Sequence, residues 1–306
     1  MTEDNRQALA GIAERAFGWL ETGGTEAERT ALQAEFDALA LDEDALEAPA
    51  ALEARVLLRL CTDQPAQRAG KMLYALFRAR MAEQQFGRFE TFQTRLAGLA
   101  KVSDPEAGLR LVSYFGNVDH DRVWQAVGDV LRQVERLIGP TFLNSGTLLG
   151  VVRERGLLKH DDDVDLAVML DGGTVEEAAA SWIRAYHALH EAGLLQKEAK
   201  RNRAVFKLVA LDELNVDLFP GWVERGRVHV YPHSFGTLSA QDVLPLAVCP
   251  HSGLPIPRDP ARMLASNYGE GWRQPDPGYS FNWRRANRKF RAFHDALEAD
   301  LSLWKL

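Results

Sequence analysis

Four aspartates lie within five positions, in the run Asp161-Asp162-Asp163-Val164-Asp165. Carboxylates this close repel one another, by about 4 kcal/mol for two unit charges ~4 Å apart at an effective dielectric constant of ~20. A protein that keeps such groups together usually does so to bind a cation. The preceding small-residue segment Gly146-Thr147-Leu148-Leu149-Gly150 can bring backbone N–H groups close to a phosphate. Together the two segments predict metal-assisted chemistry on a phosphate-bearing substrate.

The aspartates stand at the start of an apolar segment that is typical of a buried strand. Side chains alternate between the two faces of a strand, so Asp163 and Asp165 point one way while Val164 and Leu166 enter the core. Asp161 shares the carboxylate face if the extended segment reaches back to it. Mg²⁺ binds one or two carboxylates together with substrate phosphate oxygens. We therefore expect Asp163 and Asp165 to bind Mg²⁺ or Mn²⁺.

A second strand, Asn215-Val216-Asp217-Leu218-Phe219, repeats the pattern with a single carboxylate between apolar neighbours. Asp217 must point away from Val216 and Leu218. If the two strands are neighbours, Asp217 reaches the same metal. Asp163, Asp165 and Asp217 are the predicted catalytic and metal-binding residues.

Two other interpretations of the acidic run were weighed. A solvated turn is the usual role of three consecutive aspartates, but here an apolar strand follows at once. A calcium-binding loop fits the alternating spacing of Asp161, Asp163 and Asp165. That loop needs Gly at its sixth position and Glu at its twelfth, where this chain has Leu166 and Gly172.

The 306 residues predict two domains of an α+β protein. Residues 1–105 have helical spacing of apolar residues, few Gly or Pro, and no role that we can assign. Residues 106–306 change character and are the predicted catalytic domain. We expect strands at 141–144, 164–170, 204–211, 215–219 and 228–231, helices at 119–139, 175–192 and 284–304, and a loop-rich segment at 232–282.

Composition excludes several classes of protein. The net charge of −7 argues against sequence-independent nucleic-acid binding, which needs a basic footprint. No apolar run is long enough for a transmembrane helix. The acidic N-terminus MTEDNRQALAG is unlike a secretory signal, so a cytoplasmic location is expected. Cys61 and Cys249 are far apart and are expected to be free thiols in a reducing compartment.

Four blocks in this order give a resemblance to a known family. They are GTLLGVVRERGLLKHDDDVDLAV from Gly146, VDLFP from Val216, NYGEGW from Asn267, and FNW ending at Trp283. The chain resembles the LicD and fukutin-related nucleotidyltransferase-like proteins over about half of its length. It departs from them at Lys159-His160, where many members have Pro-Trp, and at Asn282, where relatives often have Asp.

The resemblance implies a nucleotidyltransferase-like fold, a small mixed sheet flanked by helices. It also implies transfer of a phospho-alcohol, an alditol phosphate or phosphocholine, from a CDP-linked donor to a hydroxyl of a glycan or glycolipid, with release of CMP. Asp163 and Asp165 would hold a Mg²⁺ that bridges the diphosphate. Asp217 would complete the metal site or act as general base toward the acceptor hydroxyl.

Five further residues are predicted to contact the substrate. They are Gly146, Thr147, Arg153, Asp161 and Lys207. Gly146 and Thr147 would bind a phosphate, and Arg153 would bind a phosphate oxygen in bidentate fashion. Lys207 either reaches the phosphates or extends along a sheet edge into solvent.

The aromatic residues of the later blocks have two interpretations. Tyr268, Trp272 and Trp283 either stack on a base or sugar or are buried under the long C-terminal loop. The arginines of the closing helix, from Arg284 to Arg291, are expected on a solvated face.

Two other functions remain open. One is transfer of a nucleotidyl group from an NTP to a small molecule, protein or RNA, which uses the same metal-binding acids. The other is a non-catalytic binding protein. Membrane-associated glycan-assembly partners and a peripheral position at the inner membrane are further options, and the oligomeric state is left open.

Overall fold

The protein is described by a computed structural model that covers residues 1–62, 67–99, 102, 109, 111–196, 203–209, 214–276, 279 and 281–305. The chain separates into two compact units, Met1–Ser113 and Tyr114–Leu306. The proposed domain bounds, 1–105 and 106–306, stay predictions. None of the described helices is both long and apolar enough to cross a bilayer.

The first unit is built from helices, as its composition predicted. Those described are α1 (Glu3–Thr22), α2 (Glu26–Ala38), α3 (Glu43–Leu46), α4 (Pro49–Leu60), α5 (Gln67–Ala82) and α6 (Phe86–Ala97). Capping residues set several of the starts: Thr25 and Glu28 form a capping box at the start of α2. Arg80, buried on α5, pairs with Glu53 of α4 at 2.6 Å between Nη2 and Oε1.

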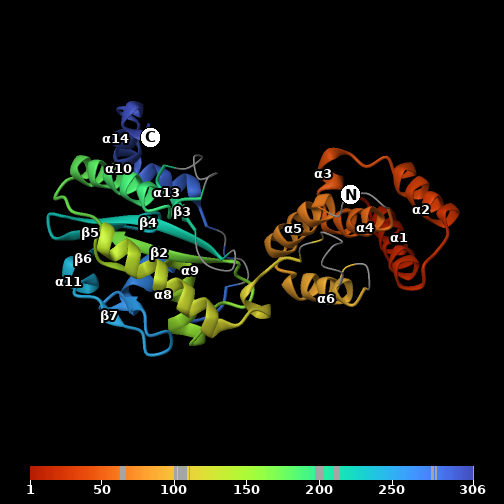
Figure 1. The fold of residues 1–306 in the computed structure, drawn as a ribbon, viewed down its shortest axis with the longest axis horizontal. Helices are drawn as coiled ribbons and strands as arrows, with labels where there is room; N and C mark the ends of the chain where they lie inside the picture. Colours follow the sequence, from red (N-terminus) through yellow and green to blue (C-terminus); the bar gives the residue numbers. More distant parts are fainter. Residues whose placement is uncertain are drawn as a thin grey trace. The chain divides into compact units, whose positions relative to one another are not determined.

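The second unit contains a mixed sheet, so the predicted α+β fold is confirmed (Figure 1). Its described strands are β1 (Thr141–Leu143), β2 (Asp163–Met169), β3 (Phe206–Leu208), β4 (Asn215–Glu224), β5 (Arg227–Val230) and β6 (Ser234–Ser239). The order is β1-β2-β4-β5-β6, with β3 also paired to β4. The β2–β4 pair is parallel and the other pairs are antiparallel. Strands β7 (Ala247–Val248) and β8 (Pro255–Ile256) form a separate small ladder.

Helices cover this sheet and connect its strands. A short turn, η2 (Phe115–Asn117), comes first. The other described helices and turns are, in chain order, α8 (His120–Leu137), α9 (Ser145–Leu149), the π-helical turn η3 (Gly150–Glu154), α10 (Val175–Glu191), α11 (Ala240–Val243), α12 (Pro260–Tyr268), α13 (Trp283–Lys289), α14 (Arg291–Glu298) and the turn η6 (Leu301–Trp304). Helix α8 packs on β1 and β2, α10 packs on β4, and the two helices contact each other. The parallel β2–β4 pair requires a crossover, which α10 supplies.

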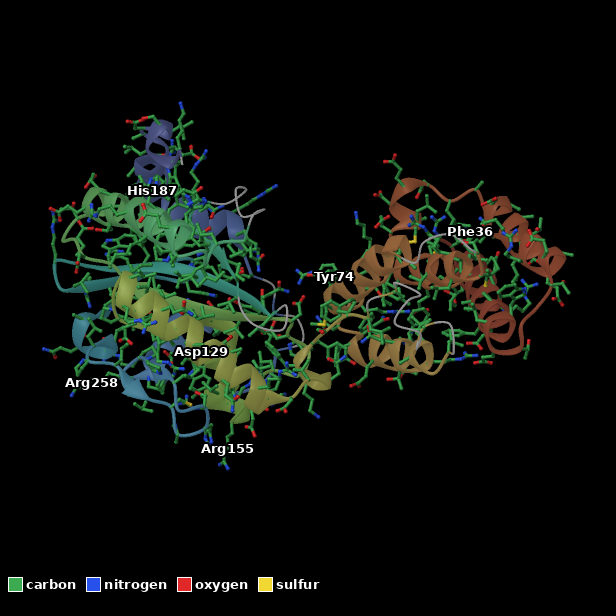
Figure 2. All side chains as sticks on the ribbon, viewed as in Figure 1. Phe36, Tyr74, Asp129, Arg155, His187 and Arg258 are labelled. Carbon is green, nitrogen blue, oxygen red and sulfur yellow. The ribbon has the colours of Figure 1, made fainter. Side chains whose placement is uncertain are left out.

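The C-terminal residues return to this helix layer. The imidazole Nε2 of His187 on α10 lies 2.6 Å from the carbonyl oxygen of Leu303 in η6 (Figure 2). The rings of Tyr186 and Trp304 are 5.1 Å apart. Phe206 of β3 lies under the same cluster, stacked on Trp182 at 3.9 Å between ring centroids.

The segment 232–282 is rich in loops, as expected, and it also contains β6 and α12. Two sequence-based expectations need correction. The closing helix is interrupted at Phe290, a buried residue whose φ of −96° and ψ of 18° end α13 before α14 begins. The Gly146 turn is the first turn of a short helix, α9. The antiparallel pairing of β3 with β4 confirms the expected hairpin, although its predicted turn, Asp212-Glu213, lies outside the described residues.

Candidate metal centre

The strand register places three functional side chains in one row across the sheet. Asp165 of β2 is paired with Asp217 of β4, and Asp217 is paired with Lys207 of β3. The neighbouring Val164 and Val216 are fully buried, whereas the carboxylates are only partly buried. The alternation therefore places Asp165 and Asp217 side by side and away from the core, as the sequence predicted.

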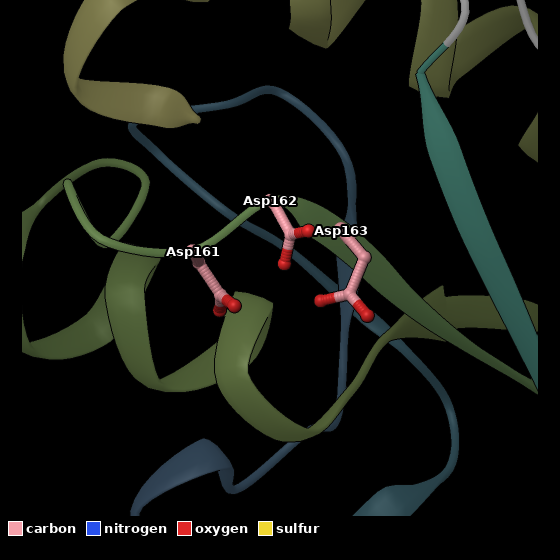
Figure 3. A group of neighbouring side chains, drawn as sticks. All are labelled: Asp161, Asp162 and Asp163. Atoms are coloured by element: carbon pink, nitrogen blue, oxygen red, sulfur yellow. The ribbon is translucent and has the colours of Figure 1, made fainter. Parts of the chain in front are cut away.

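Asp163 begins β2, and two more carboxylates precede it (Figure 3). Each of Asp161, Asp162 and Asp163 offers a carboxylate oxygen, and these oxygens lie within 4.8 Å of one another. Asp162 was not among the predicted site residues, because strict alternation would point it away from its neighbours. The strand begins only at Asp163, so alternation does not apply to Asp162. The unbroken acidic run was the signal that could have identified it.

The segment between β1 and η3 holds Asp165 by three hydrogen bonds. The backbone N–H of Gly146 donates to Oδ2 of Asp165 at 2.9 Å. The backbone N–H of Asp165 donates to Oγ1 of Thr147 at 2.9 Å, and its carbonyl oxygen accepts from the N–H of Asn144 at 2.9 Å. Gly146 and Thr147 thus position an acid of the cluster in this structure. Their predicted contact with a phosphate stays a prediction.

Two buried polar side chains beside this segment were missed by sequence reasoning. The side-chain amide of Asn144 and the hydroxyl of Ser145 are buried and have no hydrogen-bond partner among the described residues. Ser145 also has a positive φ of 42°, which is uncommon for a residue with a Cβ. These residue types at a strand end gave no signal that distinguished them from an ordinary helix cap.

The electrostatics of the cluster follow from burial and mutual repulsion. Burial, together with the charges of Asp217 and Asp162, raises the pKa of Asp163 to about 6. Burial, then the charges of Asp163 and Asp161, raises the pKa of Asp165 well above its usual range. Burial, then Asp163 and Asp162, does the same to the pKa of Asp161. The cluster is therefore poorly compensated when fully ionised, which favours a bound cation.

Lys207 provides a counter-charge at the end of the row. Its Nζ lies 2.7 Å from Oδ1 and 3.1 Å from Oδ2 of Asp217. Burial raises the pKa of Asp217, and this ion pair acts in the opposite direction. Lys207 is about half exposed, at 49% of its side-chain surface, so it can also reach a ligand above the sheet edge.

These groups fit a hard divalent cation. The donors are carboxylate oxygens, which Mg²⁺ and Mn²⁺ prefer, and they converge from β2 and from the turn before it. Burial, and then repulsion between the acids, raises the pKa values of Asp163 and Asp165, so a bound cation would stabilise their ionised forms. Asp161, Asp162 and Asp163 are compatible with a divalent metal site, and Asp165 and Asp217 lie next to them in the sheet.

Arg153 is held beside the site by Glu154 and Trp272 and not by the aspartates of the cluster. Its Nε pairs with Glu154 at 2.7 Å, and its Nη1 donates to the carbonyl oxygen of Trp272 at 3.3 Å. Its predicted bidentate contact with a phosphate stays a prediction. Trp272 is buried, as one of the two interpretations expected, whereas Trp283 is 49% exposed.

Tyr268, at the end of α12, lies near the acidic cluster. Burial, then the charges of Asp165 and Asp161 with the nearby Tyr279, raises the pKa of Tyr268 well above its usual range. Its ring lies 5.3 Å from the ring of Tyr279 and 5.3 Å from that of His233.

Residues 139–259 match the family model described as LicD/FKTN/FKRP, nucleotidyltransferase domain, so the chain carries a domain of this family. The domain implies a transferase of the nucleotidyltransferase superfamily. The match includes β1, α9, the acidic run and β4, and it ends before Tyr268 and Trp283. No curated protein sequence matches the chain.

We expect Gly146→Ala to damage the metal centre more than the fold. A Cβ at this position would lie 2.8 Å from Oδ2 of Asp161 and 3.4 Å from Oδ2 of Asp165, so the carboxylates must move. We expect Mg²⁺ affinity, measured by calorimetry, to fall at least about tenfold, as for other residues that orient metal ligands. Gly156→Ala is the control, since its Cβ meets its nearest atom at 3.9 Å. Equal affinities in the two variants would contradict the close packing of Gly146 against the acids.

Proposed function

We propose that the protein is a Mg²⁺-dependent transferase that moves a phospho-alcohol from a CDP-linked donor to a hydroxyl of a glycan or glycolipid. The observation that carries the proposal is the row formed by Asp165, Asp217 and Lys207 beside Asp163, within a LicD-family domain. This family suggests sugar or phospho-alcohol substrates. Transfer of a phosphoryl group depends on charge neutralisation and alignment rather than on a covalent intermediate.

In this proposal Asp163 and Asp165 hold the metal, with Asp161 and Asp162 beside them. When bound, Mg²⁺ neutralises charge on the donor diphosphate and on the departing CMP. The acceptor oxygen attacks the phosphorus that carries the alcohol. The bond from that phosphorus to the bridging oxygen breaks, and CMP leaves with the bridging oxygen.

Asp217 is the proposed general base. Its side chain is next to Asp165 in the sheet, and its carboxylate is held in an ion pair with Lys207. It would accept the proton of the acceptor hydroxyl as the new oxygen–phosphorus bond forms. Lys207 keeps Asp217 ionised before reaction and would bind a donor phosphate oxygen with its remaining N–H groups.

A ligand screen tests the donor class. With Mg²⁺ present, we expect CDP-ribitol, CDP-glycerol or CDP-choline to raise the melting temperature well above the value with CMP. CTP, ATP, UTP and GTP should have smaller effects. Stabilisation by an NTP alone, with release of pyrophosphate instead of CMP, would favour nucleotidyl transfer to another substrate and overturn the proposed reaction.

Lys207→Met should weaken binding of that CDP-linked donor by about 10-fold to 100-fold, the usual range for a lost hydrogen bond to a charged group. Isothermal titration calorimetry with the donor found in the screen measures this loss. Lys71→Met, at an exposed position on α5 in the first unit, is the matched control. Unchanged donor affinity in Lys207→Met would limit Lys207 to its ion pair with Asp217.

A further inference from the structure

The exposed helix α13 and the first residue of α14 carry a concentration of positive charge. Within Trp283–Arg291 the chain has Arg284, Arg285, Arg288, Lys289 and Arg291, and no acidic residue occurs between Asp276 and Asp295. All five cations are exposed. This is a local excess of positive charge in a chain whose net charge is −7.

Part of this positive charge lies on the outer side of α13. Ala286 and Phe290, four residues apart, are buried and fix the inner side of the helix. At 3.6 residues per turn, Arg284 and Arg288 lie on the opposite side. The side chain of Asn287 accepts a hydrogen bond from the hydroxyl of Tyr231 at 2.8 Å, which fixes the orientation of the helix on the sheet.

Some arginines on other described helices are paired with acids. Arg6, Arg29 and Arg132 each pair with an acid three residues earlier, at Glu3, Glu26 and Asp129. Among the described residues, Arg284, Arg285, Arg288 and Lys289 have no such ion pair, and Arg291 pairs with Asp295 at 3.6 Å. A merely solvated helix face does not require this segregation of charge.

Two exposed aromatic rings flank the basic helix. Trp283 at its start is 49% exposed, and Phe235 on β6 is 39% exposed. The Phe235 ring lies 5.0 Å from that of Phe290, at the far end of the helix. Cations next to exposed aromatic rings are typical of surfaces that lie at a lipid headgroup layer, where the rings enter the interface and the cations contact anionic headgroups.

We propose that the basic patch, defined as Arg284, Arg285, Arg288, Lys289 and Arg291 with Trp283, binds the surface of an anionic lipid bilayer. Clusters of four to eight Lys or Arg are typical of such binding. The charge of this patch is complementary to that of an anionic bilayer. Since no described helix can cross a membrane, the association is peripheral.

The inference does not depend on the proposed phospho-alcohol transfer. Contacts between aromatic rings connect the patch to residues near the metal centre. The ring centroid of Trp283 lies 4.8 Å from that of Phe281, Phe281 lies 4.6 Å from His233, and His233 lies 5.3 Å from Tyr268.

Co-sedimentation of the full chain with lipid vesicles tests the proposal. We expect binding to vesicles of equal parts phosphatidylglycerol and phosphatidylcholine, and none to pure phosphatidylcholine. Binding should weaken strongly between about 0.1 M and 1 M salt, as the screening length falls from about 10 Å to about 3 Å. Arg284→Glu with Arg288→Glu should weaken binding at least about 30-fold, from about fivefold for each cation removed.

The control is Arg132→Glu with Arg136→Glu, which makes the same charge change at the same spacing on exposed positions of α8. We expect it to bind vesicles nearly as wild type does. The milder pair Arg284→Gln with Arg288→Gln keeps the test valid if the charge reversals disturb folding, which circular dichroism would show. Quenching of tryptophan fluorescence by brominated lipid should decrease in Trp283→Phe.

Three outcomes would overturn the inference. One is the absence of binding to anionic vesicles by the wild-type protein. Another is an equal loss of binding in the α8 control, which would assign the effect to net charge. The third is tight, patch-dependent binding to heparin or RNA without binding to vesicles, which would identify a soluble polyanion as the partner.

Discussion

Asp165→Asn is expected to reduce turnover at least ~10³-fold, equivalent to ~4 kcal/mol of lost transition-state stabilisation, while the protein stays folded. The substitution preserves the shape of the side chain, and the remaining oxygen can still accept the hydrogen bond from the N–H of Gly146. What is lost is a negative charge that sits between Asp163 and Asp217. Mg²⁺ binding measured by calorimetry should be lost in parallel with turnover.

The matched control is Asp171→Asn, an exposed aspartate just beyond the other end of β2. It removes the same charge from the same segment but far from the acidic cluster, so turnover and Mg²⁺ affinity should not change. Wild-type turnover in Asp165→Asn would refute the proposed metal role. A marked fall in the melting temperature of that variant would instead indicate a structural role for Asp165.

The second large expected effect is a change in the stability of the metal-free protein with pH. Because the pKa of Asp163 is raised from 3.8 to about 6 on folding, the folded protein binds more protons than the unfolded chain between these values. Stability without metal must then fall as pH rises through this window. The stabilising contribution of protonated Asp163 is fully present below the unfolded pKa and is lost above about pH 6. Its magnitude is about 3 kcal/mol, because each unit of pKa shift corresponds to 1.36 kcal/mol.

Asp163→Asn should remove the contribution of this residue to the pH dependence, whereas the raised pKa values of Asp161 and Asp165 maintain a dependence of the same sign. Chemical denaturation without metal at about pH 4 and about pH 7.5 should show that the variant is more stable than wild type at the higher pH by up to about 3 kcal/mol. Comparison of the two proteins is needed because His233 acts with the opposite sign: burial lowers its pKa to about 4, so its contribution is lost on acidification. Identical pH profiles would contradict the electrostatic description of the cluster.

Added Mg²⁺ should reverse the dependence of stability on pH. The metal competes with protons for the carboxylates, so its stabilisation of the wild-type protein should be larger at about pH 7.5 than at about pH 5. In Asp163→Asn the increase in melting temperature on adding Mg²⁺ should be small at both values. An equal effect of Mg²⁺ on wild type and variant would place the cation elsewhere.

Much of the sheet and the central acids could be predicted because strand alternation is a local property. The order of Val164 and Asp165, and of Val216 and Asp217, determines which side chains face the core, independently of which strands are their neighbours. The register between the two strands is not local. It depends on pairing across the α10 crossover, and it sets Asp165 directly opposite Asp217.

Other features were beyond sequence reasoning because they depend on tertiary contacts. Asp162 joins the cluster because it precedes β2, which begins at Asp163, so strand alternation does not orient its side chain. The segment after Pro232 looked irregular because its prolines and glycines hid β6 and α12. The break at Phe290 arises from packing, as this residue's buried ring meets those of Trp222 and Tyr231.

The parallel β2–β4 pair also determines when the metal centre can form during folding. Asp161, Asp162 and Asp163 are adjacent in the unfolded chain, whereas Asp217 joins them only after a long loop has closed. Closing such loops costs entropy before any contact compensates, so parallel pairing tends to come late. The cation should therefore slow unfolding of the finished domain, while the rate of refolding stays nearly independent of Mg²⁺ concentration.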